Sequence, residues 1–150
     1  MRTFRNIDEF GTAVGTHLGY SAWHLVTQDQ IDRFAAATDD HQWIHVDPVR
    51  AAGGPFGTTV AHGYLTLSLV PKFLSEIYAV ENVRLGINYG CNRVRFPAPV
   101  PVDSRIRAGA EVVSVEQRPD GVQAVVRVTV ERHDATKPVC VAEVVVMLVP

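Results

Sequence analysis

Three carboxylates and two imidazoles fall within the ten residues from Asp39 to Pro48. Hydrophobic side chains are interleaved with them, which is typical of a pocket and not of an exposed run of charges. In a pocket the pKa values of these groups can be shifted. Asp40 and His45 are five positions apart, close enough to meet across one loop. A carboxylate and an imidazole that share one water can remove a proton from it and deliver a proton nearby. This stretch therefore predicts acid–base chemistry carried out on water.

A helix is predicted immediately before this stretch. Thr27 and Gln30 have the spacing of a capping box, in which each side chain bonds to the backbone of the other residue. The residues that follow have the spacing of one helical face: Ile31, Phe34, Ala35 and Thr38. We expect the C-terminal end of this helix to present Asp39 and Asp40.

The residues after His45 predict a second, short helix. Asp47 followed by Pro48 is a typical helix start, with an N-cap carboxylate and a proline at the first helical position, and Gly53 would end the helix. We therefore interpret Asp47 as a cap and not as a catalytic residue. His41 and His45 have a spacing that would suit a metal ion on a helix. Because we expect a loop between them, we predict no metal ligands.

A long apolar segment follows Ala61-His62-Gly63. Tyr64 to Ala79 is apolar on nearly every face, so we expect a helix that is buried on all sides, with a kink at Pro71. From Val83 to Phe96 apolar residues alternate. A slip in their phase near Asn92 predicts one long strand with a bulge.

The remaining segments predict an antiparallel sheet. Residues 106–118 and 122–133 predict a hairpin around Pro119-Asp120-Gly121, and residues 139–149, apolar on both faces, predict a central strand. Gly15 to Val26 predicts a first strand. Such a sheet must curl around the apolar helix, which is an α+β fold. Its open edge favours pairing with a second copy of the chain, and we predict a homodimer.

Length and composition narrow the functional classes. A chain of 150 residues suits a single domain spanning residues 1–150, and 47% hydrophobic with 20% charged residues is typical of globular proteins. The net charge of −2 predicts no nucleic-acid partner. We see no signal peptide and no membrane-spanning segment, and we expect a cytoplasmic protein. Cys91 and Cys140 lie in strand patterns and are interpreted as buried thiols, not as a disulfide.

The pattern Asp40-x-x-x-Ile44-His45-x-Asp47, followed by Ala61-His62-Gly63, resembles the hydratase motif of the MaoC-like, (R)-specific enoyl-CoA hydratases. The segment from Asn92 to Val100 resembles that family's strand-to-loop signature, and the likeness covers nearly the whole chain. The family's Gly, Asn and Pro are replaced here by Asp39, Gln42 and Trp43. The resemblance implies the hotdog fold, a curled antiparallel sheet around a long central helix, and again a homodimer.

The resemblance implies reversible hydration of a trans-2-enoyl-CoA to the (R)-3-hydroxyacyl-CoA. Asp40 would take a proton from the water, while His45 would orient the water and return a proton to the α-carbon. The backbone N–H of Gly63, at the start of a buried helix, would stabilise the thioester oxygen. Gln42, His62 and Arg93 are candidates for substrate contacts. Arg93 would bind CoA phosphates. For His62 the favoured alternative is packing at the helix start with a hydrogen bond to the backbone. No cofactor is needed, because the substrate arrives as a CoA thioester.

Three alternatives stay open from the sequence. A thioesterase on the same fold would direct the water at the carbonyl carbon. A metal-dependent hydrolase would use His41 and His45. A non-catalytic dimer that binds acyl-CoA would keep Asp40 and His45 for structural reasons only.

Overall fold

Alternating valines and alanines along three long strands build most of the sheet. The computed structural model describes residues 1–150 and places β6 (Arg105–Arg118), β7 (Gly121–Arg132) and β8 (Cys140–Val149) as antiparallel neighbours. Their inward residues are buried, including Val112, Ala124, Val126, Val128, Val130 and Ala142. β5 (Leu85–Arg95) pairs with β8 at one edge, and the short β2 (His17–Tyr20) and β3 (His24–Leu25) pair with β6 at the other.

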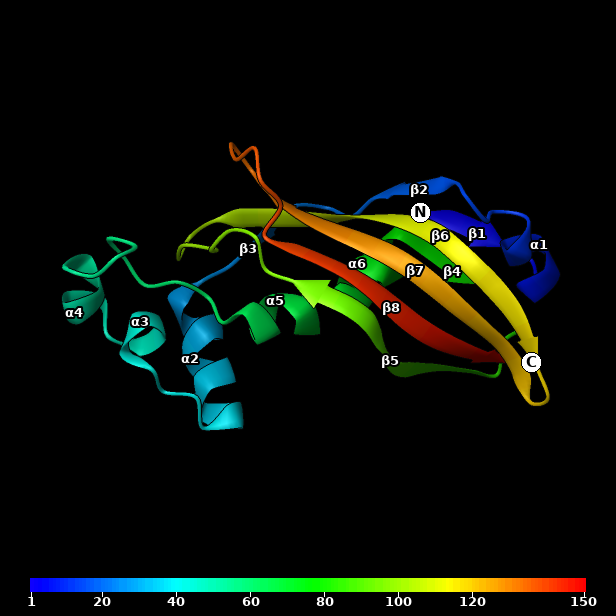
Figure 1. Cartoon of the computed structure of the whole chain (residues 1–150), viewed down its shortest axis with the longest axis horizontal. Coiled ribbons are helices and arrows are strands. Elements are labelled where there is room, and N and C mark those ends of the chain that lie inside the picture. The colour runs from blue at the N-terminus through cyan, green and yellow to red at the C-terminus, as the bar shows by residue number, and fades with distance from the viewer.

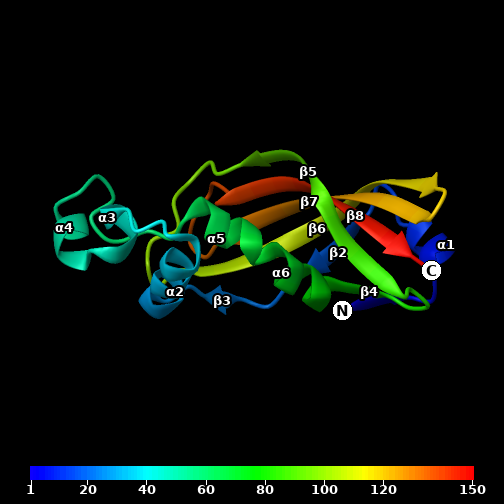
Figure 2. The ribbon, with the colours of Figure 1, turned by 90° about the horizontal axis from the view of Figure 1, so that it is seen from below.

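The sheet curls around two helices, α5 (Gly63–Ser68) and α6 (Val70–Ile77), which lie in its hollow (Figures 1 and 2). This is the hotdog fold. The expected kink is confirmed, because the helix is interrupted at Leu69 and Pro71 lies in the first turn of α6. The prediction that this helix is buried on all sides was wrong for the single chain, because Tyr64 is 70% exposed. The sheet covers one side of the helices and leaves Tyr64 of α5 exposed.

An N-terminal segment lies at the end of the sheet remote from α3 and α4 (Figure 1). β1 (Arg2–Phe4) pairs in parallel with β4 (Tyr78–Val80), and α1 (Ile7–Gly11) follows β1. Phe4 and Phe10 are fully buried, and the Phe10 ring stacks on Tyr78 with 5.3 Å between centroids. Burial raises the pKa of Tyr78 to about 12. The segment thus extends the core beyond the main sheet.

The long strands follow the predictions closely. Gly121, with φ of 147°, lies at the predicted hairpin turn, and β8 lies between β7 and β5 as expected of a central strand. β5 shifts register between Asn88 and Gly90 and again between Cys91 and Arg93, which confirms the bulge. The single strand predicted from Gly15 to Val26 was wrong, since β2 and β3 are separate short strands. Cys91 is exposed, not buried, because β5 is an edge strand.

Three more helices form the opposite end of the molecule: α2 (Gln28–Thr38), α3 (Trp43–Val46) and α4 (Pro48–Ala52) (Figure 1). Half of the expected capping box at α2 is present, because the Thr27 hydroxyl accepts from the Gln30 backbone N–H at 3.2 Å. The Gln30 side chain bonds to the His24 ring at 3.0 Å instead of returning to Thr27. No helix of the structure has the length and apolarity needed to cross a membrane.

Candidate active site

Two helix ends position the predicted acid–base stretch. α2 ends at Thr38, its C-cap residue Asp39 has the left-handed conformation (φ 57°), and Asp40 follows immediately, as predicted. The side chain of Asp47 accepts from the Arg50 backbone N–H at 3.0 Å and caps α4, which confirms its structural role. The prediction of a loop between His41 and His45 was wrong in part, because Trp43–Val46 forms one helical turn. A hydrogen bond from the Asp47 N–H to the Trp43 carbonyl, at 3.1 Å, closes this turn.

The His45 side chain is buried, and its hydrogen bond fixes which nitrogen faces the site. Nδ1 lies 2.6 Å from the Val60 carbonyl oxygen. A carbonyl only accepts, so Nδ1 carries the proton and Nε2 keeps its lone pair. The Gln28 amide also donates to the His45 carbonyl at 2.7 Å and anchors the backbone of this residue. The structure therefore presents His45 Nε2 as a proton acceptor.

His62 connects the two halves of the site. It is 2% exposed, and its Nε2 donates to the Asp40 backbone carbonyl at 2.9 Å. Its ring stacks on His45 with 3.8 Å between centroids, and Phe34 packs nearby at 5.0 Å. Nδ1 of His62 is buried without a partner. These contacts bear out the backbone hydrogen bond and packing expected of His62 and hold Asp40 beside His45.

Asp40, His45 and His62 come together although Asp40 and His62 are far apart in sequence. Each offers one atom, and these atoms lie within 4.8 Å of one another. Two groups this close can both bond to a single water at about 2.8 Å. The Asp40 side chain is 52% exposed, so water reaches it. Burial lowers the pKa of His45, which favours its neutral, proton-accepting form.

A carboxylate beside two imidazoles must also be considered as a metal site. Catalytic zinc has three protein ligands and one open position. In the observed hydrogen-bonding arrangement His62 Nε2 already donates to the Asp40 carbonyl. His62 Nδ1 is buried without a partner, and an Asp40 oxygen and His45 Nε2 are the two groups that remain to hold a water. His41, required by the metal-hydrolase alternative, is exposed and is not part of the cluster.

A cavity of about 290 Å³ opens beside His45 and Gly63. Its walls are mostly apolar and include Ile44, Phe56, Val60, Thr66, Phe96, Pro97 and Val100. Gly63 is the first residue of α5, so its N–H has no partner within the helix. A Cβ at this position would lie 2.9 Å from the Phe96 ring. Only glycine therefore allows Phe96 to pack here and leaves the backbone accessible to a ligand.

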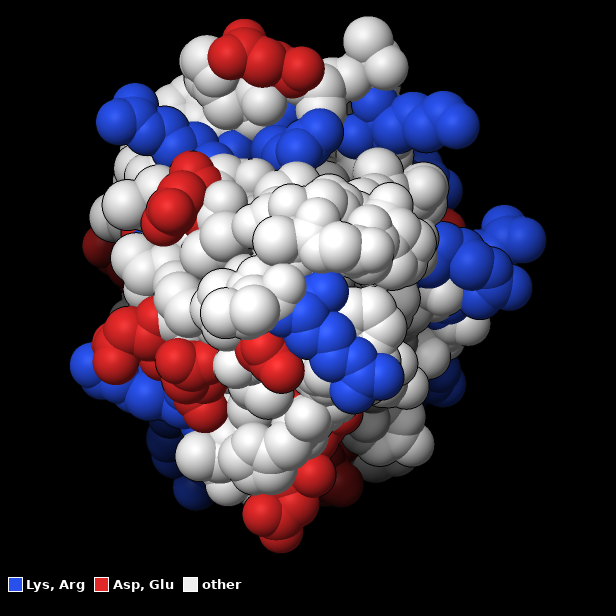
Figure 3. Space-filling view, turned by 90° about the vertical axis from the view of Figure 1, so that its left-hand side faces the viewer, with Lys and Arg blue, Asp and Glu red and all other residues white.

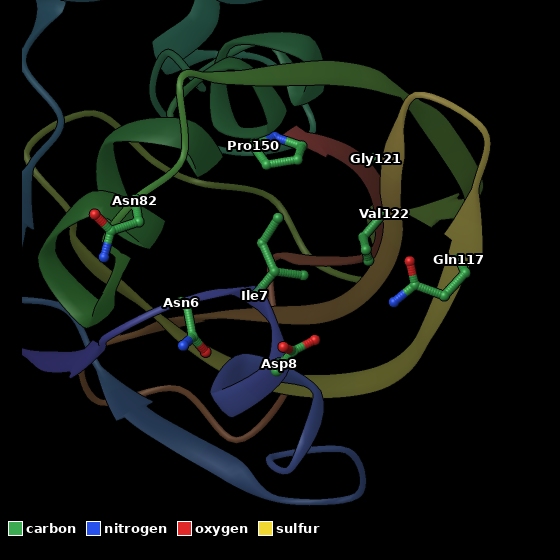
Figure 4. Close-up of a pocket in the computed structure, with 8 residues that line it drawn as sticks. All are labelled: Asn6, Ile7, Asp8, Asn82, Gln117, Gly121, Val122 and Pro150. Atoms are coloured by element: carbon green, nitrogen blue, oxygen red, sulfur yellow. The ribbon is translucent and has the colours of Figure 1, made fainter.

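Two other cavities lack acid–base partners. One of about 270 Å³ lies near α1 and the β6–β7 turn, and Asp8 is the only acidic or basic side chain among the residues that line it (Figure 4). The other, of about 220 Å³, lies between α5, α6 and β5 and is lined by Leu67, Val70, Pro71, Leu74 and Cys91 among others. Partial desolvation raises the pKa of the Cys91 thiol, which disfavours its nucleophilic thiolate.

The remaining candidates lie at the surface. Gln42 is exposed, and its backbone N–H lies 3.4 Å from an Asp40 carboxylate oxygen. Arg93 is exposed on β5 and makes no ion pair. Figure 3 views the end formed by α3 and α4 and shows both signs of charge, with a row of basic side chains just below acidic side chains at the top. No single sign covers this face, so it lacks the continuous basic surface typical of nucleic-acid binding.

Sequence reasoning missed three contributors to the site. The Val60 carbonyl sets the His45 tautomer, and no pattern marks a backbone acceptor in advance. Phe96 forms the cavity wall next to Gly63, although the sequence placed it only in the strand pattern and in the strand-to-loop signature from Asn92 to Val100. Thr66 is 1% exposed and lines the cavity. A hydroxyl between Leu65 and Leu67 in a largely apolar segment was the available signal for Thr66.

Comparison with known proteins gives the family. The MaoC like domain family matches residues 9–134. The 3-hydroxyacyl-thioester dehydratase Z of Mycobacterium tuberculosis (strain CDC 1551 / Oshkosh) is 54% identical over 150 residues, covering 99% of each chain. Two solved structures are also similar. The R-hydratase PhaJ1 of Pseudomonas aeruginosa has a TM-score of 0.68 at 25% identity, over 90% of this chain and 81% of its own. The (R)-hydratase of A. caviae has a TM-score of 0.69 at 24% identity, over 90% of this chain and 96% of its own.

The family match over most of the chain, together with the curved sheet around α5 and α6, leads to one conclusion. The chain belongs to the MaoC-like dehydratase domain family.

Proposed function

We propose that this protein is an (R)-specific hydratase that reversibly adds water to a trans-2-enoyl thioester to give the (R)-3-hydroxyacyl thioester. The observation that carries the proposal is the convergence of Asp40, His45 and His62 within 4.8 Å, beside a cavity that also contains Gly63. A relative named as a 3-hydroxyacyl-thioester dehydratase, 54% identical over its full length, supports the same reaction class. CoA is the proposed carrier of the acyl group.

The proposed chemistry begins with one water held by Asp40 and His45. As the water oxygen bonds to the β-carbon, one of its protons passes to this pair, and the same pair delivers a proton to the α-carbon. Nothing is oxidised or reduced, and the sum is addition of one water across the double bond. The two groups are coupled, so their titration and their acid and base roles belong to the pair.

Gly63 is proposed to stabilise the charge that develops during this addition. Attack at the β-carbon moves an electron pair towards the thioester oxygen. A fixed N–H directed at that oxygen binds it more strongly in the transition state than in the substrate. The apolar cavity walls exclude water, so the electrostatic stabilisation that such a donor gives to the developing charge is stronger than it would be in water. No metal or redox cofactor is required by these steps.

Purified protein with trans-2-enoyl-CoAs of increasing chain length tests this function. We expect loss of the conjugated enoyl absorbance, no release of free CoA thiol, and a product of R configuration. Release of thiol would instead identify the thioesterase alternative. Binding of the enoyl-CoA with no turnover would identify the non-catalytic alternative, and activity abolished by a chelator and restored by a metal ion would favour the hydrolase alternative.

His62 is proposed to act as a positioning residue rather than to bind substrate, because its Nε2 bonds to the Asp40 carbonyl and its ring is 2% exposed. His62→Phe keeps a stacked ring but loses the donor. We expect kcat to fall by up to about 10²-fold, the scale of a misplacement of the catalytic pair by about 1 Å, with little change in KM. His62→Gln, which keeps an amide N–H, should restore most of kcat. Equal loss in both variants would contradict the positioning role.

A second copy of the chain is proposed to pair along β5, which has a hydrogen-bonded partner on one side only. Leu85 is 49% exposed, Ile87 43% and Tyr89 70%, an unusual concentration of apolar side chains on an edge strand. Asn88, Gly90 and Cys91 of this strand also line the cavity between α5, α6 and β5. A partner strand would cover these residues, and the cavity beside it would then suit an acyl chain.

Ile87→Glu combined with Tyr89→Glu tests the dimer. Charges on a paired edge are unfavourable, so we expect this variant to sediment as a monomer where the wild type is a dimer. Val49→Glu is the matched control: Val49 is an 88% exposed apolar residue on α4, away from β5, and this variant should remain dimeric. A monomeric wild type, or a dimer that survives both glutamates, would contradict the pairing. A cytoplasmic location, and phosphate binding by Arg93, stay predictions.

A further inference from the structure

The Thr66 side chain is 1% exposed and lines the cavity beside His45, and its hydroxyl makes no hydrogen bond to another group of the chain. The buried polar side chains are Ser21, His45, Thr59, His62 and Thr66. The first four all make hydrogen bonds to other groups of the chain, whereas the hydroxyl of Thr66 makes none. Burying an unpaired hydroxyl is unfavourable compared with an apolar group of the same shape. A threonine here, in place of valine, therefore indicates a partner that comes from outside the chain.

No hydrogen bond joins this hydroxyl to a carbonyl of its own helix. Helical serine and threonine commonly donate to the carbonyl four residues earlier. Ser68 does so to Tyr64 at 2.7 Å. The carbonyl available to Thr66, that of His62, accepts only the Thr66 backbone N–H, at 3.2 Å. Thr66 instead lines the cavity that His45 and Gly63 also line.

Thr66 lies on the same face of α5 as Gly63. Residues three apart are neighbours on a helix surface, and helical side chains lean towards the N-terminus. The Thr66 side chain therefore leans towards the first turn, where the Gly63 N–H is free and no Cβ stands between them. An oxygen that accepts from the Gly63 N–H would lie within the reach of a short hydroxyl one turn further along the helix.

We propose that the Thr66 hydroxyl is a second hydrogen-bond donor to the thioester oxygen of the substrate, beside the Gly63 N–H. This inference rests on the hydratase function proposed above. A carbonyl oxygen has two lone pairs and so accepts both bonds. As water adds to the β-carbon, negative charge develops on this oxygen and an enolate forms. When the α-carbon takes up its proton, the charge is lost and the C=O double bond of the thioester forms again. Thr66 donates a hydrogen bond throughout and loses no proton.

Thr66→Val, Thr66→Ser and wild type, compared in the hydration of one enoyl-CoA, test the proposal. Valine matches the shape of threonine without its hydroxyl, and serine keeps the hydroxyl. We expect Thr66→Val to lose about 100-fold in kcat, the scale of one lost oxyanion donor, while KM and the Kd of a saturated acyl-CoA change less than about threefold. Thr66→Ser should keep most of kcat. Thr129→Val, an exposed position on β7, is the matched control and should equal wild type.

Three results would overturn the proposal. One is Thr66→Val with wild-type kcat, and another is an equal loss in the serine variant, which would show a packing effect. The third is a loss confined to KM and acyl-CoA affinity, which would place the hydroxyl elsewhere on the substrate. A melting temperature of Thr66→Val at or above that of wild type would show that a loss of kcat is not a folding defect. Absence of turnover in the wild type would instead reject the hydratase function itself.

Discussion

Asp40→Asn should lower kcat for hydration of a trans-2-enoyl-CoA by about 10²–10⁴-fold, the usual contribution of a positioned acid or base. Asparagine has nearly the same shape as aspartate but cannot take up the proton of the water. The fold should be unaffected, because the side chain is 52% exposed and the contact to His62 uses the backbone carbonyl of Asp40. Loss of enoyl absorbance measures kcat, and circular dichroism checks the fold.

Asp39→Asn is the matched control for this variant. It removes an exposed carboxylate from the adjacent residue, and asparagine tolerates the left-handed conformation that Asp39 adopts (φ 57°). This variant should keep wild-type turnover. Near-normal turnover in Asp40→Asn, or equal losses in both variants, would remove Asp40 from the proposed pair.

His45→Asn should cause a loss of similar size, about 10²–10⁴-fold in kcat. The asparagine amide can replace the Nδ1–H bond to the Val60 carbonyl, observed at 2.6 Å, but nothing replaces the lone pair of Nε2. The loss would therefore report on proton transfer more than on anchoring. His41→Asn, at the exposed neighbouring imidazole, is the control and should retain activity. Retained activity in His45→Asn, or its loss in His41→Asn, would contradict the assignment.

The pH dependence of kcat gives a second check on His45. Burial lowers the pKa of His45, and the adjacent His62 acts in the same direction, while the Val60 carbonyl and Asp40 oppose them. The neutral form accepts the proton, so activity should persist below the ordinary histidine pKa of about 6.5. The stability of the fold should depend on pH for the same reason. The unfolded chain binds this proton more tightly than the folded protein, so the free energy of unfolding falls as the pH drops below about 6.5. An acid limb of kcat above 6.5 would contradict the neutral His45.

Local patterns were enough to place the elements that carry the site. Asp47 and Pro48 begin α4 as predicted, because an N-cap carboxylate and a proline with fixed φ act on the adjacent turn alone. Gly121 marks the turn between β6 and β7 for the same kind of reason. The motif residues Asp40 and His45 were likewise identified from sequence, since a few residues of loop suffice to bring them together.

Residue patterns along the chain were therefore sufficient for the set of elements, for the curled sheet around an apolar helix, and for the candidates Asp40, His45 and Gly63. The tautomer of His45, the contact of His62 with the Asp40 carbonyl and the Thr66 hydroxyl without a partner in the chain became visible in the folded protein alone. The folded protein also showed the apolar side chains exposed along β5. The physical reason is that a cap, a turn or a periodic face depends on near neighbours in the chain. A buried hydrogen bond, or the absence of one, depends on groups that meet only when distant segments pack.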